Sequence, residues 1–185
     1  MAHRPSDGRG LDLMKNRSTA LRSKGEHAWL RHAERRCRGI SRDADIDFTF
    51  THPTTARSIV DALTAVGWSV EDPVGGVTHM INDADDMYEW ATSAPKDINE
   101  VLVRLDAPGN LPYTVAINVY HPQAGTGGMF MLMPGRKEVF FSPSIDRRHI
   151  PAAPAFTDLA WYLHALVPAL VTTGLEGYEA KEIKY

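Results

Sequence analysis

Apolar and polar residues alternate over residues 44–50, so that Ile46, Phe48 and Phe50 point to one side and the polar residues between them point to the other. A period of two is typical of a β-strand with one buried face. Residues 113–120 repeat the same alternation. The two segments predict a sheet that is apolar on one face and polar on the other.

Two apolar segments, 129–133 and 138–141, flank the turn residues Pro-Gly-Arg-Lys at positions 134–137. This arrangement predicts a β-hairpin. Both segments are apolar on both faces, so we expect them at the centre of the sheet or covered on both sides. Residues 100–106 are also predicted as a strand, with Arg104 on its polar side.

Helical periodicity occurs in two places. Apolar residues recur at helical spacing in residues 56–66, and Gly67 stands where a helix commonly ends. A second helix is predicted to begin near Thr157, to contain Pro168 and to end at Gly174. Strands that follow one another through short turns are typical of the α+β class, so we expect an antiparallel sheet of about six strands with two main helices packed on one face.

Two groups of side chains on predicted strands can be explained either by core packing or by binding of a partner or metal. Met129, Met131 and Met133 lie near Phe140 in the predicted hairpin. Flexible methionine side chains serve either core packing or an adaptable apolar surface for a partner. His79 shares a face with Val77 and Ile81 in a strand predicted at residues 77–81. This position favours a buried core histidine over a metal ligand.

Charge divides the chain into two parts. Residues 1–38 contain ten basic and four acidic residues, whereas the rest of the chain contains ten basic and nineteen acidic residues. We interpret residues 1–38 as a basic, partly disordered N-terminal arm with a short helix, and residues 39–185 as a single α+β domain. Nucleic-acid binding through the arm is an open alternative, which the sparse aromatic residues and the net charge of −3 disfavour.

The single cysteine, Cys37, excludes an internal disulfide and favours a reducing compartment. The longest apolar stretch, residues 159–171, contains His164 and Pro168 and is too short to cross a bilayer. The first residues carry no apolar core of the kind that a secretory signal needs. We therefore expect a cytoplasmic protein with no membrane partner.

Asp45 and Asp47 are the candidate catalytic and metal-binding residues. Two carboxylates two positions apart on a strand share one face and can together hold Mg²⁺. The segment resembles the Asp-x-Asp strand of the nucleotidyltransferase superfamily, which implies metal-dependent nucleotidyl or phosphoryl transfer. The chain departs from that family in two places: Gly39-Ile40 replaces a Gly-Ser pair, and Asn118 stands where a third carboxylate is wanted, which leaves Asp106 as the remaining acid.

The favoured hypothesis is a non-catalytic binding protein, an inhibitor or immunity-type partner of a basic protein, that needs no cofactor. The chain has no nucleophile elbow, phosphate-binding loop or metal motif. Its acidic loop at residues 82–86 precedes Tyr88 and Trp90, which we expect to be exposed. Exposed aromatic residues next to charged residues are typical of protein interfaces. The expected contact residues are Asp85, Asp86, Tyr88, Trp90, Arg104 and Asn118.

Overall fold

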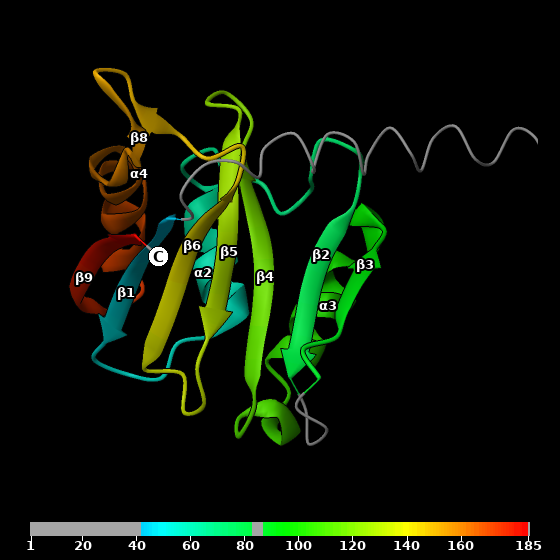
Figure 1. Ribbon diagram of the computed structural model, residues 1–185. Helices are drawn as coiled ribbons and strands as arrows, with labels where there is room; N and C mark the ends of the chain where they lie inside the picture. Colours follow the sequence, from blue (N-terminus) through cyan, green and yellow to red (C-terminus); the bar gives the residue numbers. More distant parts are fainter. Residues whose placement is uncertain (1–41, 83–86, 185) are drawn as a thin grey trace, which may run out of the picture. The chain divides into compact units, whose positions relative to one another are not determined.

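The computed structural model describes residues 42–82 and 87–184 (Figure 1). These residues form a seven-stranded antiparallel sheet and three α-helices, which confirms the α+β class with one strand and one helix more than expected. Figure 1 shows the helices on one side of the sheet. The predicted arm, residues 1–38, and the candidate contacts Asp85 and Asp86 lie outside the described residues.

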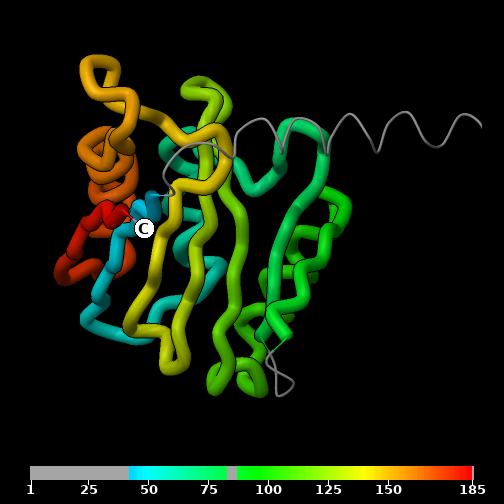
Figure 2. The backbone as a smooth tube through the Cα atoms, in the orientation of Figure 1, coloured from blue at the N-terminus to red at the C-terminus, as the bar shows by residue number. Residues whose placement is uncertain are grey.

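The strand order is β3-β2-β4-β5-β6-β1-β9, and each neighbouring pair is antiparallel. The first strand lies between β6 and the last strand of the sheet, as the backbone trace shows (Figure 2). A separate two-stranded ribbon pairs β7 with β8. The bounds are β1 Arg42–Phe50, β2 Val77–Asn82, β3 Trp90–Ser93, β4 Thr114–His121, β5 Thr126–Leu132, β6 Glu138–Ile145, β7 His149–Ile150, β8 Ala153–Thr157 and β9 Leu175–Lys184.

The three helices are α2 Ala56–Thr64, α3 Ile98–Leu105 and α4 Leu159–Val171, and short 3₁₀ turns cover Pro95–Asp97 and Pro108–Asn110. Helix α2 follows its predicted apolar stripe, and Gly67 adopts a φ of +94° just after it. None of the helices in residues 42–82 and 87–184 is long and apolar enough to cross a membrane.

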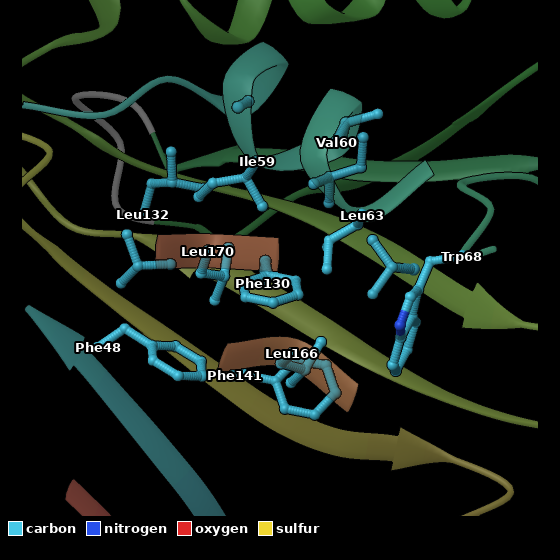
Figure 3. Close-up of a cluster of buried hydrophobic side chains, with 14 of the residues drawn as sticks. Phe48, Ile59, Val60, Leu63, Trp68, Phe130, Leu132, Phe141, Leu166 and Leu170 are labelled. Atoms are coloured by element: carbon cyan, nitrogen blue, oxygen red, sulfur yellow. The ribbon is translucent and has the colours of Figure 1, made fainter. Parts of the chain in front are cut away.

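The hydrophobic core lies between the helices and the face of the sheet that they cover (Figure 3). Phe48 of β1, Phe130 of β5 and Phe141 of β6 form its aromatic centre, with the Phe130 and Phe141 ring centroids 4.8 Å apart. Leu166 and Leu170 of α4 pack against the same cluster. The alternation of β1 therefore places its apolar side chains in the core, as predicted.

The strand predicted at residues 100–106 is wrong, because this segment forms helix α3. Val101, Leu102 and Leu105 are buried at helical spacing, whereas Val103 is 65% exposed. The alternation of Val101, Val103 and Leu105 suggested a period of two, but the helical period buries more apolar surface here. Arg104 consequently lies on the helix side of the sheet and not on its polar face.

The second predicted helix begins slightly later than expected. Its N-cap is Asp158, whose carboxylate accepts a hydrogen bond from the Trp161 backbone N–H at 3.1 Å. Thr157 belongs instead to β8, where its backbone N–H donates to the Glu182 carboxylate of β9 at 3.0 Å. Pro168 lies inside the helix and Gly174, with a φ of +93°, follows its end.

Candidate functional site

One row of side chains crosses the face of the sheet that α2, α3 and α4 leave uncovered, which we call the open face. Each member of the row lies opposite the next in the strand register, from β3 at one edge to β9 at the other. Side chains of directly opposed residues are close enough to touch. In order, the row is Trp90, Met80, Ala116, Met131, Phe140, Asp47 and Glu179.

The middle of this row is apolar. Met80 is 1% exposed and Ala116 is fully buried, while Met131 and Phe140 are half-buried. Trp90 at the β3 edge remains 46% exposed. The prediction that the hairpin strands are central is confirmed, and on their second apolar side Met131 and Phe140 are partly exposed.

The β1–β9 end of the open face is acidic. Asp43, Asp45 and Asp47 of β1 share this face with Glu179 and Lys181 of β9. The Lys181 Nζ donates to Asp47 Oδ2 at 2.7 Å. This hydrogen bond, then the charge of Asp47, and more weakly the charges of Glu179 and Asp45 raise the pKa of Lys181. Four carboxylates against one ammonium group on these two strands leave this end of the face negative.

Asp47 has one oxygen that the described residues do not satisfy. Its Oδ2 accepts from Lys181, but its Oδ1 is buried and no donor in residues 42–82 and 87–184 reaches it. A buried acceptor without a donor is unfavourable by about 1–3 kcal/mol. This oxygen lies where the apolar row meets the acidic end, because Asp47 stands between Phe140 and Glu179.

The structure brings several predicted residues together on the open face. Asp45, Asp47, Trp90 and Asn118 all lie on it, with Asn118 opposite Met129. Tyr88 stands just before β3 in the left-handed region, with a φ of +49°, and its backbone N–H donates to Asn82 Oδ1 at 3.2 Å. Its side chain is about half exposed.

Arg104 does not join them, because it serves an internal contact. Its guanidinium meets Nε2 of His79, a buried residue on the helix side of β2, and His79 Nδ1 lies 3.2 Å from the Val77 carbonyl oxygen. Burial lowers the pKa of His79, and the charge of Arg104 lowers it further, against an opposing hydrogen bond to Val77. The neutral ring donates from Nδ1 and accepts Arg104 at Nε2. The contact therefore fixes α3 to β2.

The metal-dependent alternative needs a third ligand beside Asp45 and Asp47, and residues 42–82 and 87–184 do not supply one there. Asp106 accepts hydrogen bonds from the backbone N–H groups of Ala56 and Arg57 at 2.7 and 3.0 Å, so it caps α2 on the helix side. Asn118 is separated from β1 by two intervening strands. No three His, Cys, Asp or Glu side chains in the described part of the chain are grouped to hold a metal ion. The described residues therefore do not form a metal site around Asp45 and Asp47 of β1.

The chain matches no protein-family model, and no similar protein was found among curated sequences or among solved structures.

Proposed function

We propose that this chain is a cytoplasmic, non-catalytic binding protein that holds a basic protein against the open face, as an inhibitor or immunity-type partner does. The observation that carries the proposal is the row from Trp90 to Glu179, in which an exposed aromatic residue and an apolar centre end at a cluster of carboxylates. The single cysteine, Cys37, supports a reducing compartment.

The apolar centre supplies the part of an interface that excludes water. Protein interfaces combine an apolar core with a polar rim, and aromatic and methionine side chains are enriched in that core. Met131 and Phe140 are already half-buried, so these two side chains lose little conformational freedom when a partner covers them. Trp90 offers a larger exposed ring at the β3 edge, and tryptophan is among the residue types that contribute most to binding at interfaces.

The acidic end determines the charge of the partner. Four carboxylates of β1 and β9 attract lysine and arginine side chains and accelerate encounter with a basic surface. Asp43 and Glu179 are exposed at this end, so their carboxylates are accessible to a partner's arginine or lysine. A negatively charged partner would be repelled by the same cluster.

Affinity capture from a lysate of the source organism tests the proposal when it is done with matched variants. Met131→Asp places a charge in the apolar centre, and Asp45→Lys reverses a charge in the acidic end. Their controls are Val103→Asp and Glu100→Lys, which make the same changes at exposed positions of α3. All four variants are first checked by circular dichroism for the wild-type fold.

The expected result is one basic protein that binds the wild-type chain and both α3 variants, and that binds the two open-face variants at least about tenfold more weakly. The complex should also weaken as salt is raised. A captured protein that is acidic, or that is retained equally by Met131→Asp and Asp45→Lys, would contradict the proposal. Capture that disappears on deletion of residues 1–38 and on nuclease treatment would instead support the nucleic-acid alternative.

A further inference from the structure

A hollow of about 510 Å³ lies on the helix side of the sheet, away from the open face. Four segments that are distant in the sequence meet there: the residues after α2, the turn from β4 to β5, the turn from β6 to β7, and α4. A volume of this size is in the range of small-molecule sites, roughly 300–1,000 Å³. None of the residues in the open-face row lines it.

Three aromatic rings form the inner wall of the hollow. The ring centroids of Trp68 and His121 are 5.2 Å apart, those of His121 and Trp161 are 5.6 Å apart, and those of Trp68 and Trp161 are 6.2 Å apart. Trp68 is 3% exposed and lies at the border of the core cluster (Figure 3), whereas His121 and Trp161 are half-buried. Trp68 and Trp161 each meet His121 nearly edge to face, at interplanar angles of 82° and 71°, an arrangement that aromatic pairs favour.

Arg148 places a positive charge beside these rings. Its guanidinium carbon lies 5.1 Å from the centroid of the Trp161 ring, and its Nε donates to Asp158 Oδ2 at 3.3 Å. Only its Nε takes part in this ion pair, so its two terminal nitrogens are not used by Asp158. The planar fork of an arginine suits a carboxylate or a phosphate group.

The other polar side chains of the hollow can each donate one or more hydrogen bonds. His121 Nδ1 accepts the Ala124 backbone N–H at 3.2 Å, so the neutral ring carries its proton on Nε2. Gln123 and His164 line the same hollow, and no Asp or Glu among the described residues does. The lining therefore offers hydrogen-bond donors to an anionic group, while Asp158, which pairs with Arg148, offsets part of the positive charge.

The site is held in place by its neighbours. Asp158 binds the side chain of Arg148 and at the same time caps α4 by accepting the Trp161 backbone N–H. The Arg148 backbone N–H donates to Tyr162 Oη at 3.0 Å, and Tyr162 is fully buried. Arg148 and Trp161 are thus positioned by a shared residue, so that binding does not have to order them.

We propose that this hollow binds a small planar anion, an aromatic ring that carries one phosphate or carboxylate group. The ring stacks against Trp161 or His121, and the anionic group receives hydrogen bonds from Arg148. A neutral ring would lose the charge interaction, and an inorganic anion would lose the stacking. This site is independent of the proposed protein partner.

Titration calorimetry of the full chain tests the site with four probes: adenosine 5′-monophosphate, indole-3-acetate, adenosine and inorganic phosphate. At least one of the two ring-bearing anions should bind at least about tenfold more tightly than adenosine and than phosphate. Tighter binding of the nucleotide would assign a phosphate ligand, and tighter binding of indole-3-acetate would assign a carboxylate ligand.

Two variants and one spectroscopic measurement locate the binding. Arg148→Gln should weaken the binding of that anion at least about tenfold, whereas Lys96→Gln, which removes an exposed positive charge elsewhere, should leave it unchanged. In the wild-type chain, the indole N–H resonances of Trp68 and Trp161 should shift on titration while that of Trp90 does not. The proposal would be overturned if neither ring-bearing anion bound more tightly than adenosine, or if Arg148→Gln left the binding of that anion unchanged.

Discussion

Phe140 of β6 lies directly opposite Asp47 of β1, so the apolar centre of the open face ends against a carboxylate. On the other side of Asp47 stands Glu179, and Lys181 donates to the same carboxylate at 2.7 Å. A hydrophobic surface and a charged cluster thus share one residue. The charge of Asp47 can therefore be tested through its neighbour Lys181.

Asp47→Asn should lower the pKa of Lys181 toward its ordinary value. The Asp47 hydrogen bond is the largest cause of the raised pKa, and the charge of Asp47 is the second. An amide can still accept a hydrogen bond, but it carries no charge. Titration of the Lys181 side chain by heteronuclear NMR measures the effect. Glu182→Gln is the control, because Glu182 lies on the opposite face of β9 and binds Thr157; an equal shift in both variants would show that the pKa reflects overall charge.

The sheet and two of its helices could be predicted because their signals are local. The alternation of β1 and the apolar stripe of α2 each depend on residues that are neighbours in the sequence. Helix α3 was missed because a period of two and a helical period coincide over Val101 and Leu105 in so short a segment. The burial of Leu102 and the exposure of Val103 separate the two interpretations.

The sites were harder to predict because they depend on pairings between distant segments. Asp45 and Asp47 were identified from their spacing, but the order of strands determines that Phe140 and Glu179 flank Asp47. The visible signal was a hairpin that is apolar on both faces. The hollow beside Trp161 left no signal in the sequence, since its rings come from three separate segments.

His79 should make the stability of the fold depend on pH below neutrality. Burial is the main cause that lowers its pKa in the folded chain below the ordinary value of 6.5. The unfolded chain therefore binds a proton at a pH where the folded chain does not, so stability present above pH 6.5 is lost as the pH falls below it. Protonation also removes the lone pair that accepts Arg104.

Urea unfolding between pH 7.5 and pH 5 (roughly one unit or more on either side of the ordinary histidine value) measures this loss. His79→Gln should reduce the slope of the unfolding free energy against pH, because the side chain that replaces the imidazole does not titrate. His149→Gln, at an exposed histidine of β7, serves as the matched control. An unchanged slope in His79→Gln would show that the buried ring does not control the dependence.

Arg136→Lys should destabilise the fold by about 2–4 kcal/mol. Arg136 is buried in the turn between β5 and β6, and its terminal nitrogens donate to four backbone carbonyl groups in three segments of the chain. A lysine ammonium has three donors on one atom and cannot reach all four acceptors. Chemical denaturation measures the change, and Lys137→Ala at the adjacent exposed position is expected to stay within about 0.5 kcal/mol of wild type.

Gly128→Ala should be among the most damaging single-methyl changes in the sheet. A Cβ at this position would lie 2.3 Å from the Ser142 carbonyl oxygen and 2.6 Å from the Phe141 ring. The register between β5 and β6 shifts next to Gly128, so the two backbones approach closely there. Because the obstructing oxygen belongs to the backbone, the strands must separate, and a loss of about 2–4 kcal/mol is expected. Gly109→Ala is the control, because its added Cβ would have no neighbour within 4 Å; a loss in Gly128→Ala no larger than in that control would show that the β5–β6 pairing adapts.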